Sequence, residues 1–203
     1  MKGATVILAA GDFPREGGAA REALDAAERV VCCDSAADEY RLRTGREPDF
    51  TVGDCDSLEG KFGNVVRVDE QETNDLAKAI RFCRSRGWEK PLILGACGKR
   101  EDHTIGNVFL ALDENVGILT DRGRFVPVEG RATLAVDEGC AISVFAPDRS
   151  TKARSEGLVW PLDGVVFDSL ARATLNRAAG TEITIETDRR ILVYIAFRED
   201  NGL

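Results

Sequence analysis

The sequence predicts an α/β protein with an N-terminal doubly wound, mostly parallel, Rossmann-like sheet domain, followed by a small all-β sandwich or barrel domain. Over roughly the first 120 residues, apolar runs of strand length alternate with helical patterns, which is the rhythm of βαβ units. After Asp121 this alternation stops, and short β-rich segments separated by turn residues follow. The change of period near residue 122 predicts two domains, residues 1–122 and 123–203.

The predicted strands of the first domain are largely apolar on both faces, as strands buried in a parallel sheet are. They cover residues 5–10, 29–33, 50–52, 64–68, 91–95 and 116–119. Helical patterns cover residues 17–27, 35–43, 73–86 and 102–112. The clearest is 73–86, where Leu76, Ile80 and Cys83 line one face and Gly87 ends the pattern.

The second domain contains short β-rich segments and no convincing helical pattern. Strands are predicted at residues 125–128, 132–136, 141–145, 157–162, 181–186 and 191–197. Turn residues separate several of them, at Glu129-Gly130, Glu138-Gly139, Pro147-Asp148 and Asp163-Gly164.

Composition excludes several classes of protein. The 43% hydrophobic and 31% charged fractions are those of a soluble globular chain, and the net charge of −8 argues against a nucleic-acid partner. The apolar run Ala4–Ala10 is too short to cross a membrane and is a weak signal peptide. Six cysteines without a CxxC pair, and a single histidine, argue against zinc and fit a reducing cytoplasm.

The segment Gly53-Asp54-Cys55-Asp56-Ser57 follows the predicted strand 50–52 and carries two carboxylates. Unpaired charge at a buried strand end costs several kcal/mol, which a hard cation would offset. Mg²⁺ is usually bound by one or two carboxylates together with substrate phosphates. For this pentapeptide alone, a solvated acidic turn is an equally good interpretation.

Other strand ends bring acidic and basic residues to the same edge of the predicted sheet, where ligands of doubly wound folds bind. Asp34 follows the second strand, the acidic stretch 69–75 follows the fourth, and the stretch 95–103 follows the fifth with Lys99, Arg100 and Asp102. Lys78 lies one turn after Asp75. Individually, Asp75 and Asp102 are as well explained as helix caps, Lys78 as a solvated residue and His103 as a structural one.

Together these residues favour a polyphosphate–Mg²⁺ site and metal-assisted phosphoryl or pyrophosphoryl transfer. Neither a GxxxxGK[ST] loop nor a GxGxxG turn occurs, and Gly11-Asp12-Phe13-Pro14 reads as an unspecialised turn. The acids at this edge of the sheet, called the rim below, are Asp34, Asp54, Asp56, Asp75 and Asp102. Catalysis by a Ser/His/Asp triad is hard to build with a single histidine among them.

The ordered motifs resemble those of the thiamin pyrophosphokinase (thiamin diphosphokinase) family over nearly the whole chain. The family's first acidic-glycine motif corresponds to residues 34–37 and its GDxDS motif to 53–57. Its TD-xx-K motif corresponds to 74–78, and its GxxGGRxDHxxxN motif to 95–107. A GLxW strand of its small β-domain corresponds to 157–160.

The resemblance implies an enzyme that transfers a pyrophosphoryl group from ATP to the hydroxyethyl oxygen of thiamin, requires Mg²⁺ and releases AMP. It implies that the catalytic residues are Asp54, Asp56, Asp75 and Asp102, the first three as metal ligands. It implies ATP or phosphate contacts from Asp34, Ser57, Lys78, Gly98, Arg100 and His103. It implies thiamin contacts from Gln71, Thr174 and Asn176, and a cytoplasmic homodimer whose thiamin sites combine both subunits.

The chain departs from the family pattern at four places. Ser35 and Ala36 replace two glycines, Asn74 replaces a threonine, Lys99 replaces a glycine, and the serine-rich thiamin segment becomes residues 173–176 (ATLN). Because the last change removes two hydroxyls, a pyrophosphokinase for another heterocyclic alcohol, such as 6-hydroxymethyl-dihydropterin, is an alternative. A non-catalytic nucleotide or thiamin-diphosphate sensor is a third hypothesis, against which the five retained rim acids argue.

Overall fold

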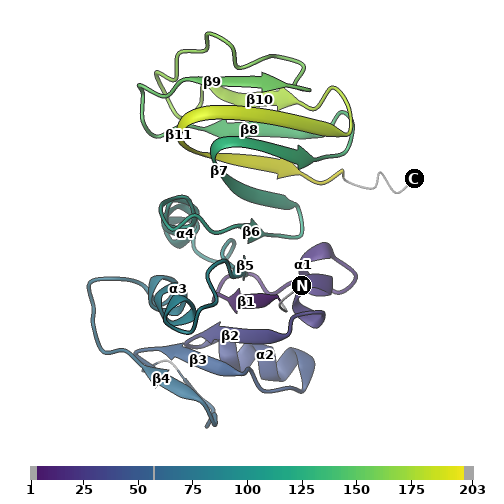
Figure 1. Cartoon of the computed structure of the whole chain (residues 1–203). Helices are drawn as coiled ribbons and strands as arrows, with labels where there is room; N and C mark the ends of the chain where they lie inside the picture. Colours follow the sequence, from purple (N-terminus) through teal and green to yellow (C-terminus); the bar gives the residue numbers. More distant parts are fainter. Residues whose placement is uncertain (1–3, 57, 199–203) are drawn as a thin grey trace. The chain divides into compact units, whose positions relative to one another are not determined.

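The computed structural model describes residues 4–56 and 58–198. The chain divides into two compact units, Met1–Asp121 and Arg122–Leu203, and each unit is described by itself (Figure 1). Ser57, which the sequence predicts as a phosphate contact, lies outside the described residues.

The N-terminal unit is a mixed α/β structure built on a parallel sheet. The strand order is β6-β5-β1-β2-β3-β4, and each neighbouring pair is parallel. The coarse fold class predicted from the sequence, an α/β protein with a mostly parallel sheet, is therefore confirmed. Its elements are β1 (Thr5–Leu8), α1 (Ala19–Asp25), β2 (Arg29–Cys33), α2 (Ala36–Thr44), β3 (Phe50–Gly53), β4 (Val65–Arg67), α3 (Asp75–Ser85), β5 (Leu92–Leu94), α4 (Glu101–Asp113) and β6 (Ile118–Leu119).

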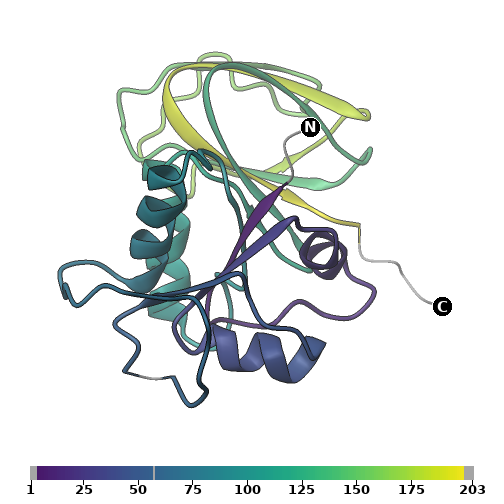
Figure 2. The same cartoon turned by 60° about the horizontal axis from the view of Figure 1, so that its bottom comes forward.

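Helices cover both faces of this sheet (Figure 2). Successive side chains of a strand point to opposite faces. Val6 and Leu8 of β1 pack with Leu24 of α1 and Tyr40 of α2, all almost fully buried. The helix α3 packs against β1, β2 and β3, with Ile80 completely buried. Apolar residues on both faces of the strands thus account for a two-sided core.

The chain reverses direction across the sheet at β1. From β1 it proceeds through β2 and β3 to β4, and then returns to β5 on the other side of β1. In open α/β sheets, ligands bind beyond the carboxyl ends of the strands at such a reversal point. The loops after β1 and β5 are therefore expected to contribute to the site, together with the ends of β2 and β3.

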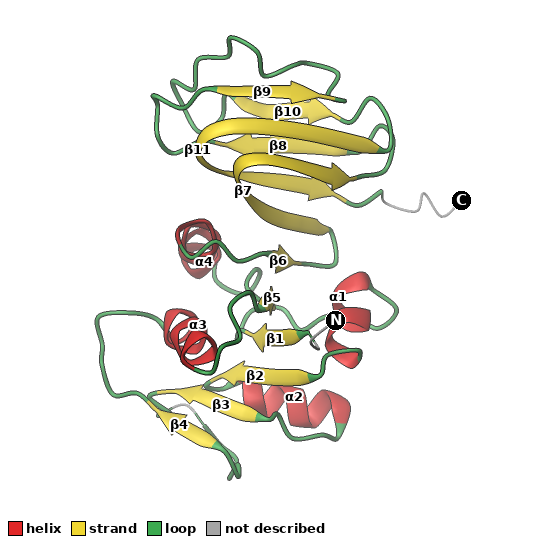
Figure 3. Cartoon of the chain, viewed as in Figure 1, coloured by secondary structure: helices red, strands yellow, loops and turns green. Residues whose placement is uncertain are grey.

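The described residues of the C-terminal unit form strands and loops, with no helix among them (Figure 3). The long strand β11 pairs antiparallel with β7, β8 and β9, and β8 also pairs with β10. The strands are β7 (Gly123–Ala135), β8 (Ala141–Phe145), β9 (Ala153–Glu156), β10 (Ala173–Arg177) and β11 (Glu182–Ala196).

Two predicted interruptions in this unit are bends within continuous strands. Residues 125–128 and 132–136 were expected as separate strands, but β7 runs through Glu129-Gly130. Its partner β11 likewise runs through residues 187–191, where the pairing register shifts. Gly130 has φ of +73°, so these turn-forming residues bend the hairpin instead of ending it.

The predicted strand at residues 157–162 is wrong. Only Leu158 forms an isolated bridge, to Ala178, and Pro161 has no backbone N–H for a ladder. The strands in this part of the unit are β9 and β10, whose polar sequences ARSE and ATLNR gave no clear apolar pattern.

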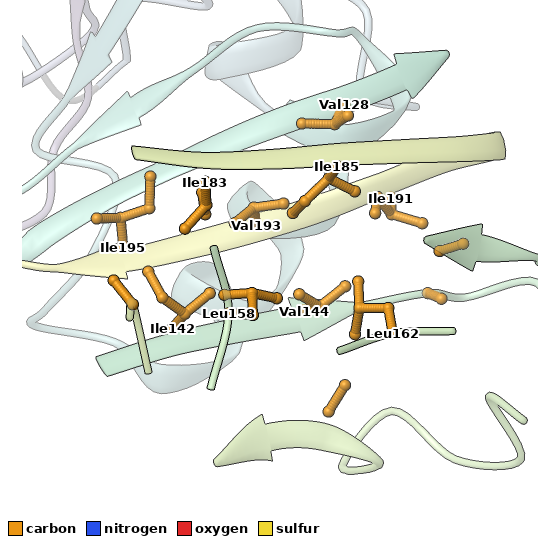
Figure 4. Packing of buried hydrophobic residues seen from close by; sticks show 14 of the residues in the cluster. Val128, Ile142, Val144, Leu158, Leu162, Ile183, Ile185, Ile191, Val193 and Ile195 are labelled. Carbon is orange, nitrogen blue, oxygen red and sulfur yellow. The ribbon is translucent and has the colours of Figure 1, made fainter. Parts of the chain in front are cut away.

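Branched aliphatic side chains form the core of the C-terminal unit. Ile142 and Val144 of β8 face Ile183, Val193 and Ile195 of β11, and all are almost fully buried (Figure 4). Burying each such side chain is worth about 1.5–3 kcal/mol. This cluster is a core of its own, as expected for a compact unit.

Candidate active site

Gly53, the last residue of β3, lies between two of the predicted site carboxylates. A Cβ atom at this position would stand 3.0 Å from Cβ of Asp34 and 3.2 Å from Oδ1 of Asp75. Asp34 directly follows β2, is 7% exposed, and its N–H donates to the carbonyl of Val52 at 3.0 Å. The structure therefore brings Asp34 and Asp75 together at the end of β3, where only glycine leaves room between them.

Asp54 is held by two donors beside this pair. Its Oδ1 accepts the N–H of Asp56 at 3.2 Å, and its Oδ2 accepts Nε2 of Gln71 at 3.3 Å. These two hydrogen bonds, with the charges of Lys78 and Arg67 adding to them, lower the pKa of Asp54. Asp54 is therefore an anion at neutral pH, and Gln71 lies beside a predicted metal ligand.

Asp56 points outward. Its side chain is 73% exposed, and its Oδ1 lies 3.5 Å from the guanidinium of Arg67. The structure shows no direct contact between Asp56 and Asp75 among the described residues. The two acids of the pentapeptide thus have different surroundings.

Lys78 is a buried cation among carboxylates. Its Nζ lies 3.1 Å from Oδ1 of Asp75, and its side chain is 2% exposed against 31% for Asp75. Burial lowers the pKa of Lys78, but the hydrogen bond to Asp75 and the charges of Asp75, Asp54 and Glu70 outweigh it and raise the pKa. In this structure the lysine thus neutralises acids of the rim.

The loop after β5 has three consecutive carbonyl oxygens that are all hydrogen-bonded. Gly11 N–H donates to Gly95 O at 2.8 Å, and Asp12 N–H donates to Cys97 O at 2.8 Å. Between them, Nδ2 of Asn107 donates to Ala96 O at 2.9 Å. The turn after β1, which read as unspecialised in the sequence, therefore holds this loop in place, and that interpretation is wrong.

The backbone N–H groups of the same loop differ from its carbonyls. Within the described residues, those of Ala96, Cys97, Gly98 and Lys99 donate no hydrogen bond. Gly98 and Lys99 have φ of +81° and +56°, and a Cβ at Gly98 would stand 2.0 Å from Oδ2 of Asp12. Loops of this kind in front of a helix form anion-binding concavities. Here the loop stands directly before α4.

Arg100 and Asp102 pair with each other at the start of α4. The guanidinium Nη2 lies 2.6 Å from Asp102 Oδ2, and both side chains are 65% exposed. The Arg100 guanidinium, helped by the N–H of His103, lowers the pKa of Asp102 to about 2. No hydrogen bond or ion pair within the described part of the chain joins Asp102 to Asp54 or Asp75. His103 is exposed.

The predicted thiamin residues of the C-terminal unit have local structural roles in this structure. Asn176 is 6% exposed, and its Nδ2 donates to Trp160 O at 2.6 Å while its Oδ1 accepts Trp160 N–H at 3.2 Å. Thr174 Oγ1 donates to Ala171 O at 2.9 Å. Asn176 thus fixes the backbone of Trp160, whose side chain is 56% exposed.

The described residues contain no cluster of three or more His, Cys, Asp or Glu side chains arranged to hold a metal ion. The donor chemistry nevertheless fits Mg²⁺, which needs one or two carboxylates when substrate phosphates supply the other ligands. Asp75 lies 3.1 Å from the Lys78 ammonium, and Asp54 helps to raise the pKa of the same lysine. The shared metal site of Asp54, Asp56 and Asp75 stays a prediction.

Four organising residues of this rim were missed in the sequence. Asp12 packs on Gly98, Asn74 and Asn107 bond each other, and Glu70 accepts hydrogen bonds from Glu72 N–H at 2.9 Å and Thr73 N–H at 3.2 Å. Asn107 ends the GxxGGRxDHxxxN match, which was a usable signal. Asp12 and Asn74 act here through tertiary contacts that have no local pattern, and the local bonds of Glu70 are not distinguished by its acidic stretch.

Two surface hollows lie elsewhere. One of about 590 Å³ is lined by residues including Arg154 and Asp188 of the C-terminal unit, and one of about 720 Å³ by Arg29 and Trp88 at the amino ends of strands. Neither contains a predicted site residue. The candidate site is thus defined by the chemistry of the strand ends.

None of the helices in the described residues has the length and apolarity needed to cross a membrane.

A parallel α/β sheet with carboxylates, a buried lysine and an anion-binding loop at its carboxyl edge defines an enzyme of the phosphate-transferring, nucleotide-binding class. Comparison with known proteins gives the family. The profile described as thiamin pyrophosphokinase, catalytic domain, matches residues 20–118, and that described as thiamin pyrophosphokinase, substrate-binding domain, matches residues 123–194. The chain belongs to the thiamin pyrophosphokinase family, which are ATP-dependent pyrophosphotransferases, and the resemblance found in the sequence is confirmed.

Solved structures show the same fold. Thiamin pyrophosphokinase from Geobacillus thermodenitrificans is 21% identical with a TM-score of 0.75, covering 98% of this chain and 99% of that one. A thiamin pyrophosphokinase family protein from Enterococcus faecalis is 13% identical with a TM-score of 0.78, covering 97% and 100%. The Candida albicans enzyme is 16% identical with a TM-score of 0.73, covering 97% and 90%. No curated protein sequence matches the chain.

Proposed function

We propose that this chain transfers the pyrophosphoryl group of ATP to the hydroxyethyl oxygen of thiamin, forming thiamin diphosphate and AMP. The acceptor oxygen forms a bond to the β-phosphorus of ATP, and the bond from that phosphorus to the oxygen bridging the α-phosphorus breaks. The observation that carries the proposal is the loop after β5, where, among the described residues, the carbonyls of Gly95, Ala96 and Cys97 are hydrogen-bonded and the N–H groups of residues 96–99 are not. Asn107 joins this loop to the cap of α3, directly before Asp75.

The proposed roles follow from the geometry. The loop 96–99, with Gly98, holds phosphate oxygens, and Arg100 and His103 at the start of α4 add donors. Asp54, Asp75 and the more exposed Asp56 would hold Mg²⁺, which when bound neutralises developing phosphate charge. Lys78 pairs with Asp75, and Asp102 orients Arg100. Asp34 and Ser57 are proposed as further contacts to ATP or its phosphates.

The acceptor is proposed to lie beside Gln71, whose amide contacts Asp54. On the C-terminal unit, Thr174 and Asn176 are proposed to contact thiamin, and Asn176 also holds the backbone of Trp160. Residues 1–122 are proposed as the Rossmann-like catalytic domain, and residues 123–203 as a β-sandwich that contributes to thiamin binding and dimerisation.

A cytoplasmic homodimer is part of the proposal. Five large apolar side chains of the C-terminal unit are 42–88% exposed, namely Val159, Trp160, Val166, Leu170 and Leu175. Such residues suit a contact across a two-fold axis. All six cysteines are free thiols, which suits a reducing compartment. Sedimentation of a fully active 22 kDa monomer would overturn the dimer.

A second candidate acceptor is a hydroxymethylpterin. The observation behind it is that the Asn176 amide is bonded to the Trp160 backbone, so the altered segment 173–176 keeps few polar groups for the thiamin contact that the family motif implies. The C-terminal unit is therefore the part of the chain that would distinguish the two acceptors.

The test is an assay with ATP, Mg²⁺ and a panel of alcohols, with AMP and ADP separated by chromatography. The proposal expects AMP that depends on thiamin. ADP would indicate transfer of a single phosphoryl group, AMP formed only with the pterin would favour the second acceptor, and nucleotide binding without turnover would favour a sensor.

A further inference from the structure

The side-chain amides of Asn74 and Asn107 form a continuous hydrogen-bonded chain between α3 and the loop after β5. Asn74 Oδ1 accepts the N–H of Ala77 at 2.9 Å, which caps α3. Asn74 Nδ2 donates to Asn107 Oδ1 at 3.1 Å, and Asn107 Nδ2 donates to Ala96 O at 2.9 Å. Each amide accepts at its oxygen and donates at its nitrogen.

The side chain of Asn107 is a polar group in a buried position. It lies inside α4 and is 7% exposed, and a buried polar side chain is unfavourable unless its hydrogen bonds are made. Its two bonds both go to elements of the candidate site, one to the cap of α3 and one to the loop. Packing of α4 alone gives no reason for an amide at this position.

Of the three neighbouring carbonyls in this loop, that of Ala96 is the one whose hydrogen-bond donor is a side chain. Backbone N–H groups hold the carbonyls of Gly95 and Cys97, whereas an amide of Asn107 holds that of Ala96. A peptide group can rotate once its carbonyl oxygen has lost its hydrogen-bond donor. Rotation here would turn a carbonyl oxygen toward the concavity in which phosphate oxygens are proposed to bind, and two oxygens with negative charge repel.

We propose that Asn74 and Asn107 are positioning residues that lock the phosphate loop to the start of α3, which carries Asp75. This inference rests on the proposed function for the identity of the ligand. The amide chain fixes the available N–H groups of residues 96–99 relative to the carboxylate next to the cap. It touches neither substrate directly.

The sharpest variant is Asn74→Ser. A serine can still cap α3, because it is as good a cap as asparagine, but it lacks the amide that reaches Asn107. Asn74→Ala is the matched control that removes the cap as well. Asn107→Ala removes the chain from its other end, and the double variant with Asn74→Ser tests whether the two amides act as a unit.

Turnover and hydrogen exchange are measured on the full chain. For Asn74→Ser we expect kcat to fall about tenfold with the melting temperature held, since small misplacement of reacting groups costs rate. The KM for thiamin should stay within about twofold, because that contact is not altered. The double variant should be no slower than Asn107→Ala. Amide protons of Gly11 and Asp12, which bond the loop, should exchange faster in each amide-chain variant.

Two results would overturn the inference. One is Asn74→Ser with wild-type kcat and wild-type exchange at Gly11 and Asp12. The other is a loss of melting temperature in Asn74→Ala and Asn107→Ala without any loss of kcat, which would make the amides merely structural. If the wild-type chain forms no AMP, the proposed function fails, and the exchange rates alone decide whether the amides lock the loop.

Discussion

The ammonium nitrogen of Lys78 lies 3.1 Å from Oδ1 of Asp75, and the lysine side chain is only 2% exposed. A buried lysine is stable only with a partner, and the acids of the rim repel one another without the lysine. Lys78 is therefore a structural requirement of the rim as well as a candidate phosphate contact.

Replacing this lysine by an apolar side chain tests that requirement. For Lys78→Met we expect a loss of about 3 kcal/mol of unfolding free energy, near the lower end for a broken buried pair because Asp75 is partly solvated. Urea denaturation measures it, with Lys90→Met at an exposed lysine as the control. A Lys78→Met chain as stable as the control would show that the pair contributes nothing.

Gly53→Ala tests the approach of Asp34 and Asp75 across β3. The added Cβ would lie 3.0–3.2 Å from both residues, so they must move apart. We expect a loss of about 1–3 kcal/mol from overpacking and a fall in turnover of at least about tenfold from displaced carboxylates. Gly63→Ala, with open space around its Cβ, is the matched control. Equal turnover in both variants would disprove the requirement.

Glu70 gives the rim a dependence on acid pH. The Thr73 hydroxyl first, then the Arg81 guanidinium and two backbone N–H groups, lowers the pKa of Glu70 from 4.5 to about 2. Because the folded-state pKa is lowered, its stabilising contribution is present above about pH 4.5 and is lost as the pH falls toward 2.

Glu70→Gln should therefore be less stable than wild type at pH 7 and pH 5, and the gap should be clearly narrower at pH 3. Urea midpoints at pH 7, 5 and 3 measure this, with Glu89→Gln at an exposed glutamate as the control. A gap that stays constant over this range would contradict the role of the carboxylate charge.

Lys99 stands in left-handed backbone, with φ of +56°, while its Nζ lies 2.8 Å from Oε2 of Glu39. Left-handed backbone costs a non-glycine residue about 1–2 kcal/mol, and an exposed ion pair contributes about 0–1 kcal/mol. Lys99→Gly should therefore be as stable as wild type or up to about 1 kcal/mol more stable. Glu39→Gln, which removes only the pair, is the comparison. Because both variants lack the pair, a Lys99→Gly chain no more stable than Glu39→Gln would contradict the strain in the left-handed backbone.

The parallel sheet could be predicted because its buried strands are local apolar runs. The acidic site could be predicted because such sheets bind ligands at the carboxyl ends of their strands. The sequence did not predict the bends in β7 and β11, because glycine-containing turn residues look alike in a loop and in a bulge. Polar strands such as β10 gave no period at all.

The rim shows the same division. The positions of Asp34 and Asp75 followed from the strand ends, whereas their contact across Gly53 required the fold. Asp12 and the pair Asn74–Asn107 act through residues distant in sequence, and contacts of that kind leave no periodic trace. Glu70 bonds residues two and three positions away, and one acid in an acidic stretch gives no sign of that role. Asn176, predicted as a thiamin contact, bonds the Trp160 backbone in this structure, and that bond can be seen only in the folded chain. Its contact with thiamin stays a prediction.

The central claim is that the acidic rim transfers a pyrophosphoryl group to thiamin, and phosphorus NMR of the products tests it most directly. With ATP, Mg²⁺ and thiamin, we predict AMP and thiamin diphosphate in equal amounts from the wild-type chain. Asp54→Asn should lower the rate roughly 10²–10³-fold, as loss of a group stabilising transition-state charge does, with only a small fall in the metal-free melting temperature from its two weakened hydrogen bonds. Asp69→Asn, a nearby exposed acid, should change little. Formation of ADP and thiamin monophosphate, or full activity in Asp54→Asn, would contradict the account.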